Sequence, residues 1–279
     1  MTGERLTSFR RGRLRFDVVD RGPLDGEPVV LLHGFPERAS SWAAVQSLLG
    51  EQGLRTYAPD QRGYSPDARP FGRWSYRFPT LVDDVVALID EIGSPVHLVG
   101  HDWGAMVAWG LADRRPDLVR SLTAVSVPHP RAMAHAAVQG PQLKQSWYFL
   151  PFNVTGLVEG IVRIRPAAFD VPLRKGGMRA EDVTRFHAEI VDDGALPGAL
   201  AWYRGALLSP PRVGIIRVPT TYVWSDRDVA LSWAAAQACG RYVEADYELV
   251  VLEGMNHWIP RQAPEALSQA VLARIRSSA

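Results

Sequence analysis

The residues best placed to do chemistry lie in a short turn with an aspartate at its tip. Gly100, Asp102 and Gly104 form a Gly-x-Asp-x-Gly pattern between an apolar run at 96–99 and a helical pattern. A sharp strand-to-helix turn of this kind lifts one side chain clear of a sheet, and the usual tip residue is a serine that attacks acyl groups. A carboxylate instead forms an ester by attacking an alkyl carbon. The pattern therefore favours an electrophilic sp3 carbon as the substrate centre.

A nucleophile of this kind needs a base, and the base needs a partner that orients it. Polar groups that contain Asp228 and His257 follow the apolar runs at 220–224 and 248–252. Both residues therefore lie just past the carboxyl end of a predicted strand, where open α/β sheets keep their sites. We predict that His257 is the base and Asp228 its partner. Asp226 has the sequence context of an ordinary helix cap.

A tetrahedral intermediate also needs donors for its negatively charged oxygen. The backbone N–H groups expected there are those of Trp103, directly after the nucleophile, and Phe35, in the loop that follows an early strand. The segment 33–36, His-Gly-Phe-Pro, would on its own be an ordinary tight turn. Combined with the Asp102 turn, it predicts an oxyanion hole.

The remaining histidines show no spacing typical of metal ligands, so we interpret them as structural. They are His33, His97, His101, His129, His135 and His187. Every predicted participant is an ordinary side chain or amide, and no metal or cofactor is implied.

The elements that must position these residues alternate along the chain. Short apolar runs between helical patterns predict an α/β fold with a mostly parallel central sheet flanked by helices. The predicted strands are 13–20, 28–32, 55–58, 96–99, 122–127, 220–224 and 248–252. The first alternates polar and apolar residues, which indicates an antiparallel edge strand, whereas continuous β-branched runs indicate central strands buried on both faces.

Two helices have recognisable ends in the sequence. Thr80 and Asp83 resemble a capping box, and Gly93 suits the position after a helix end. Pro264 suits the first position of a final helix.

The strand–helix alternation stops in the middle of the chain. Residues 129–218 are rich in proline, glycine and aromatic side chains. We predict that they form an inserted helical cap over Asp102, and that residues 1–128 and 219–279 form the two parts of the core.

Composition limits the protein's partners and location. The formal net charge of +1 over 279 residues creates no field that would favour nucleic acid or an anionic membrane. The single cysteine, Cys239, suits a reducing compartment, and no apolar run approaches the length of a membrane span. These features predict a cytoplasmic protein, and they leave a homodimer open.

The motifs together resemble the α/β-hydrolase superfamily and, within it, the epoxide hydrolases. The matching segments are 33–36, 60–65, 100–104, 202–204 and 254–258. The family order of nucleophile, acid and histidine is also the order of Asp102, Asp228 and His257. The resemblance implies the α/β-hydrolase fold with its inserted helical cap.

In the epoxide hydrolases, two cap tyrosines bind the epoxide oxygen and supply its proton. Tyr203 matches the second tyrosine. The first lies three residues before a Tyr-Phe pair, and here that position falls on Gln145, which is a departure from the family. Either one tyrosine suffices, or Trp147 or Tyr148 donates the second hydrogen bond.

The resemblance implies a two-step reaction on a small hydrophobic epoxide. Asp102 would form an alkyl ester, His257 would activate the water that hydrolyses it, and a vicinal diol would leave. The resemblance to haloalkane dehalogenases keeps one alternative open, because these enzymes use the same Asp nucleophile. Their halide leaving group needs N–H donors, and Trp147 or Trp202 could supply one where the Phe35 side chain cannot.

A second alternative is a non-catalytic ligand-binding protein on a hydrolase scaffold. The complete set of Asp102, Asp228 and His257 opposes it, because a degenerate copy would be expected to have lost a member.

Overall fold

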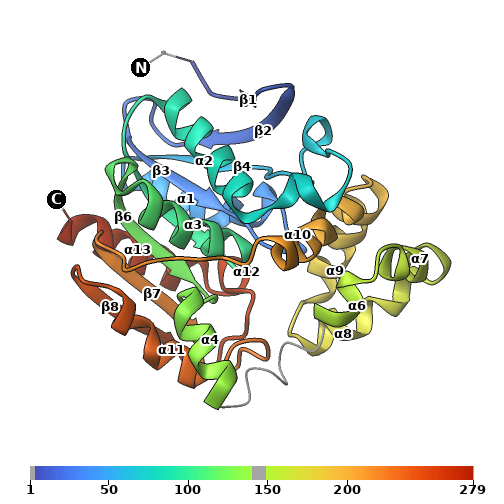
Figure 1. Cartoon of the computed structure of the whole chain (residues 1–279). Helices are drawn as coiled ribbons and strands as arrows, with labels where there is room; N and C mark the ends of the chain where they lie inside the picture. The colour runs from blue at the N-terminus through green and yellow to red at the C-terminus, as the bar shows by residue number, and fades with distance from the viewer. Residues whose placement is uncertain (1–3, 140–148, 279) are drawn as a thin grey trace.

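The protein is built around one twisted sheet (Figure 1). The computed structural model describes residues 4–139 and 149–278, and within these ranges the sheet has eight strands in the order β1-β2-β4-β3-β5-β6-β7-β8. They are β1 Ser8–Arg11, β2 Leu14–Arg21, β3 Glu27–Leu32, β4 Leu54–Pro59, β5 Val96–His101, β6 Val119–Val125, β7 Thr220–Ser225 and β8 Tyr247–Leu252. The pairs from β4 to β8 are all parallel. The prediction of a mostly parallel sheet is confirmed.

Two strands, β2 and β6, differ from the sequence prediction. The strand predicted at 13–20 is antiparallel as expected, but its edge position is wrong, because the short β1 pairs with its outer side. The strand predicted at 122–127 begins earlier, at Val119, and ends at Val125. Ser126 has a φ of 66°, which an extended strand excludes.

The central strands are buried on both faces because helices cover both. Val29 and Leu31 of β3 belong to one apolar cluster, and Val30 and Leu32 belong to another. Successive side chains of a strand point to opposite faces, so an uninterrupted apolar run serves both layers.

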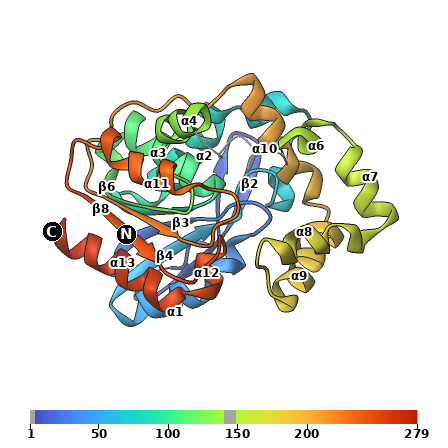
Figure 2. The same cartoon turned by 90° about the horizontal axis from the view of Figure 1, so that it is seen from below.

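Figure 2 shows α1, α12 and α13 on one side of the sheet and α2, α3, α4 and α11 on the other. These helices are α1 Ala43–Glu51, α2 Phe78–Ile92, α3 Trp103–Arg114, α4 Pro130–Gln139, α11 Trp233–Ala238, α12 Ile259–Gln262 and α13 Pro264–Ser277. Across the described ranges, no helix combines the length and the apolar character needed to cross a bilayer.

The predicted helix ends are confirmed in two cases and wrong in one. Helix α13 begins at Pro264, and Gly93 follows α2 with a φ of 81° while its N–H donates to the Ile89 carbonyl. The start predicted at Thr80 is wrong, because α2 already begins at Phe78 without a side-chain cap.

A helical lobe lies at one end of the sheet (Figure 1). It contains α6 Phe149–Asn153, α7 Leu157–Ile164, α8 Asp170–Lys175, α9 Ala180–Phe186 and α10 Leu196–Leu208. Helix α4 precedes this lobe in the chain and packs against α11 of the core. The cap boundaries 129–218 remain a prediction.

Ion pairs connect the lobe to the core. Arg185 pairs with Glu37 at 3.0 Å and Arg261 pairs with Asp182 at 3.0 Å. Arg38 also reaches the lobe, at 2.9 Å from an Asp193 carboxylate oxygen. In each of these pairs at least one side chain is largely buried, so solvent screens the attraction less than at an open surface.

Candidate active site

The turn between β5 and α3 has the strained geometry expected of a nucleophile-bearing turn. Asp102 has a φ of 53° and a ψ of −119°, values that residues with a side chain rarely adopt. Its flanking glycines allow the turn to close. A Cβ on Gly100 would lie 2.3 Å from the Gly104 carbonyl oxygen, and one on Gly104 would lie 2.1 Å from that of Leu32. Only glycine fits at either position.

A third glycine lets an amide reach the Asp102 carboxylate. A Cβ on Gly34 would lie 2.4 Å from Asp102 Oδ1. Because Gly34 has none, the loop approaches closely and the Phe35 N–H donates to Asp102 Oδ1 at 2.8 Å. The Trp103 backbone N–H also stabilises this carboxylate. The structure thus brings both amides predicted for the oxyanion hole to the same carboxyl group.

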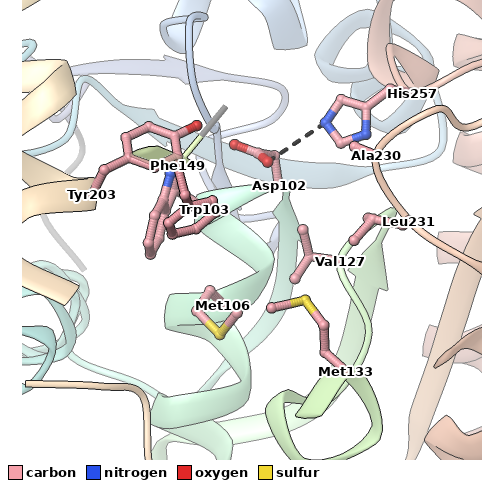
Figure 3. Close-up of a pocket in the computed structure, with 10 residues that line it drawn as sticks. All are labelled: Asp102, Trp103, Met106, Val127, Met133, Phe149, Tyr203, Ala230, Leu231 and His257. Atoms are coloured by element: carbon pink, nitrogen blue, oxygen red, sulfur yellow. Dashed lines mark ion pairs between the residues drawn. The ribbon is translucent and has the colours of Figure 1, made fainter. Parts of the chain in front are cut away.

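His257 lies between two carboxylates (Figure 3). Its Nδ1 is 2.8 Å from Asp228 Oδ2, and its Nε2 is 3.5 Å from Asp102 Oδ2. The other oxygen of Asp228 accepts from the Ala230 and Leu231 amides, at 2.8 and 3.2 Å. Asp228 is therefore fixed, and it holds the imidazole with Nε2 directed at Asp102.

The backbone of His257 is anchored by two residues that the sequence analysis did not assign to the site. The carbonyl oxygen of His257 accepts from His101 Nε2 at 2.8 Å and from the Ser126 hydroxyl at 3.1 Å. Burial, followed by repulsion from His257, lowers the pKa of His101 to about 4, so His101 is a neutral donor. Ser126 directly follows the end of β6, and this position could have identified it as a residue near the site. The sequence interpretation of His101 as a structural residue agrees with this role, because His101 holds the backbone of His257 in place.

The electrostatics of the three groups favour an ion pair in the free enzyme. Burial opposes the charged form of Asp102, but the hydrogen bond and charge of His257 hold the pKa of this carboxyl below its usual value. Burial likewise opposes a charged His257, but Asp228 and Asp102 together raise the pKa of this imidazole well above its usual value. The charged forms of Asp102 and His257 therefore stabilise each other.

Tyr203 of α10 faces Asp102 across the cavity, with its hydroxyl turned toward the carboxylate (Figure 3). Its ring is positioned by edge-on contacts at centroid distances between 4.9 and 5.4 Å. The surrounding rings are Phe35, Trp103, Phe149 and Phe152. Such contacts restrict the ring and leave only the hydroxyl to act.

The residues on either side of Tyr203 explain why it points into the site. Successive helix residues turn by about 100°. Trp202 donates its indole N–H to the Arg62 carbonyl at 2.7 Å, and Arg204 pairs with Glu159 of the lobe at 2.7 Å. The alternative in which Trp202 supplies an N–H to a halide is wrong, because that N–H already binds the core backbone.

The three remaining cap candidates, Gln145, Trp147 and Tyr148, lie outside the described residues. Their roles stay predictions. Among the residues that the structure does describe, no three His, Cys, Asp or Glu side chains are placed to share a metal ion.

A cavity of about 700 Å³ opens above Asp102 beneath the lobe. Asp102, Tyr203 and His257 line it together with apolar lobe residues that include Phe169 and Leu173. A volume of this size, with a few polar groups in an apolar wall, suits a hydrophobic small molecule.

Comparison with known proteins places the chain in a family. Residues 29–270 match the family model described as the alpha/beta hydrolase family. The chain is 32% identical to the AB hydrolase superfamily protein YfhM of Bacillus subtilis, over 99% of this chain and 100% of the relative. It is 30% identical to epoxide hydrolase 3 of Siraitia grosvenorii, over 95% and 96% of the two chains.

Solved structures agree with the sequence relatives. The crystal structure of epoxide hydrolase VrEH1 from Vigna radiata matches with a TM-score of 0.81 and 28% sequence identity, covering 97% of this chain and 99% of that chain. The protein is a hydrolase that belongs to the α/β-hydrolase family and, within it, to the epoxide hydrolases.

Proposed function

We propose that this hydrolase converts epoxides to vicinal diols through a covalent ester on Asp102. The observation that carries the proposal is the distribution of partners around that carboxylate. Oδ1 accepts from the Phe35 amide, whereas Oδ2 lies toward His257 Nε2. Oδ1 is thus set to become a carbonyl oxygen and Oδ2 is the oxygen that attacks. The names of the relatives in Siraitia grosvenorii and Vigna radiata support epoxides as the substrate class.

In the first step, Oδ2 of Asp102 attacks one epoxide carbon and the bond from that carbon to the epoxide oxygen breaks. The released oxygen takes the phenol proton of Tyr203. Attack by a carboxylate requires the charged form, which the low pKa of Asp102 secures. The product of this step is an alkyl ester.

Ester formation converts His257 into a base. Asp102 loses its charge in the ester, so only Asp228 still favours the imidazolium, and the pKa of His257 falls. The proton that His257 gives up restores the phenol of Tyr203 through solvent in the cavity. The neutral Nε2 is then free to accept a proton from water.

In the second step, His257 takes a proton from water and the resulting hydroxide attacks the Cγ carbon of the Asp102 ester. The negative charge develops on Oδ1, which already accepts from the Phe35 amide, and the Trp103 amide also stabilises this carboxyl group. Loss of one such donor typically costs about 3 kcal/mol of transition-state stabilisation. The bond from Cγ to the alkyl oxygen then breaks, the imidazolium gives its proton to that oxygen, and the diol leaves. The new carboxyl group of Asp102 passes its proton to His257, which restores the starting state.

Single turnover in oxygen-18 water tests this pathway. The water oxygen enters the carboxylate of Asp102, so one labelled oxygen is expected in the peptide that contains Asp102, and none in the diol of the first turnover. Mass spectrometry of the digested protein and of the diol measures both. Label that appears only in the diol would mean that water attacks the epoxide directly.

The haloalkane dehalogenase alternative has lost one of its candidate halide donors, because the Trp202 indole N–H binds the Arg62 carbonyl. An alkoxide leaving group needs a proton, and the Tyr203 phenol can supply one. Halide release from a bromoalkane, without diol formation from any epoxide, would favour the dehalogenase. Absence of turnover on both substrate classes would favour the ligand-binding alternative.

Replacing Asp228 by asparagine is expected to lower kcat by about 100-fold. Asparagine can still orient the His257 ring, but it removes the charge that stabilises the imidazolium. The matched control is Asp226→Asn, because Asp226 is exposed and its carboxylate accepts from the Gly254 amide rather than from His257. Steady-state kinetics of both variants measure the difference. An equal loss of kcat in the two variants would show that Asp228 has no special role in catalysis.

The two chemical steps should respond differently to pH. The pKa of Asp102 lies below the ordinary 3.8, so its charged form, and with it the rate of ester formation, persists as the pH falls to about 5. Ester hydrolysis needs neutral His257 and should slow over the same range as the imidazole becomes protonated. Stopped-flow tryptophan fluorescence in single turnovers separates the steps. A common loss of both rates at one pH would contradict this assignment.

A further inference from the structure

Two compartments of very different size meet at the reacting groups. Besides the cavity of about 700 Å³, a second cavity of about 40 Å³ lies on the core side. Asp102, Tyr203, Ala230 and His257 line both cavities. An epoxide held between Asp102 and Tyr203 therefore lies where the two compartments meet, so its two carbons can carry substituents into different compartments.

The small compartment is lined by side chains from four separate segments (Figure 3). Met106 comes from α3, Val127 follows β6, Met133 comes from α4, and Leu231 follows β7. Apart from the four shared residues, its described lining consists of apolar and aromatic side chains. A polar substituent would lose its water there without gaining a hydrogen bond, so the compartment selects hydrocarbon.

The volumes limit what each side can hold. One water-sized group needs about 10–15 Å³ of such cavity volume. The small compartment therefore admits about three such groups, and the large one about fifty. Dense packing around Met106, Val127 and Leu231, which are all buried, leaves little room for expansion.

We propose that the enzyme selects asymmetric epoxides, with hydrogen or a short alkyl group of up to about three carbons on one side and a long apolar group on the other. This selection rests on the epoxide hydrolase activity proposed above. Met133 sets the limit on the short side. Met133 is half-buried, whereas Met106, Val127 and Leu231 are buried. Its unbranched thioether side chain fills irregular space, which a smaller residue at this position would leave open to the substrate.

Three epoxides test the limit. The oxides of 1-octene, trans-2-octene and trans-5-decene place a hydrogen atom, a methyl group and a butyl group in the small compartment. We expect kcat/KM for trans-5-decene oxide to be at least about tenfold below that for trans-2-octene oxide, because the butyl group exceeds the available space. Met133→Ala should raise the ratio of kcat/KM for trans-5-decene oxide to that for trans-2-octene oxide about tenfold. Met133→Trp should lower both constants relative to that for 1-octene oxide.

Val138→Ala is the matched control, since Val138 lies on the same helix and is exposed to solvent. It should leave all three constants unchanged. If Met133→Ala melts below the assay temperature, Leu231→Ala opens the same compartment from another element and should shift the same ratio.

The outcomes separate the selection from the activity itself. Diol from trans-5-decene oxide as fast as from trans-2-octene oxide in the unaltered enzyme would overturn the selection and leave the activity intact. A ratio that neither Met133→Ala nor Leu231→Ala changes would also overturn it. Absence of diol from all three epoxides would overturn the proposed function, and the selection with it.

Discussion

Replacing His257 by glutamine is expected to stop the enzyme after its first step, with the substrate attached to Asp102. Glutamine cannot accept a proton from water, so ester hydrolysis should slow by about 10⁴-fold. Ester formation uses the Asp102 carboxylate and the Tyr203 phenol without a base, and it should continue, because the Phe35 and Trp103 amides still stabilise the charged carboxylate. Intact-protein mass spectrometry should show an added mass equal to that of one epoxide, and peptide mapping should place it on Asp102.

The protein offers a matched control for this variant. His187 Nε2 lies 2.7 Å from an Asp170 carboxylate oxygen in the lobe, so it forms an imidazole–carboxylate pair without facing Asp102. His187→Gln should turn over normally and accumulate no adduct. Full turnover by His257→Gln would remove His257 as the base.

Replacing Asp102 by alanine should abolish both steps. Loss of a catalytic nucleophile lowers kcat by about 10⁶-fold in a well-studied serine enzyme, and we expect a loss of about 10⁴- to 10⁶-fold here. No adduct should form, even when His257→Gln is added in the same chain. Diol formation measured by mass spectrometry gives the rate, and diol binding measured by calorimetry shows that the pocket persists.

A residual adduct in the doubly substituted chain would identify another nucleophile. Loss of diol binding together with loss of turnover would instead show that Asp102 supports the structure of the pocket. These two readouts separate chemistry from folding, which a rate alone cannot do.

The chemical centre could be predicted because its members follow strand ends. Parallel strands align their carboxyl ends at one edge of a sheet, so Asp102, Asp228 and His257 had to lie near each other once β5, β7 and β8 were recognised. The structure places Asp228 Oδ2 2.8 Å from His257 Nδ1. The mostly parallel sheet was predictable for a related reason, since runs such as 28–32 have the apolar continuity that burial on both faces demands.

Other features depended on contacts that no local pattern encodes. His101 meets the His257 carbonyl across 156 positions of chain, and Trp202 meets the Arg62 carbonyl across 140. Met133 carries no motif, and it borders the site only because α4 packs beside the sheet. The start of α2 at Phe78 was also missed, because the chain begins this helix without the side-chain cap that the sequence rule expects.

The close contacts of three glycines around Asp102 identify a part of the molecule that does not tolerate substitution. Any side chain at Gly34, Gly100 or Gly104 would collide with the turn or with the nucleophile itself. Substrate choice can instead be varied at wall residues away from the turn, such as Met133 on α4 and Phe169 and Leu173 in the helical lobe, where one side chain can be altered at a time. A mutant library restricted to these wall residues, with Tyr203 of the lobe kept, would explore new substrates while every member retains the reaction centre.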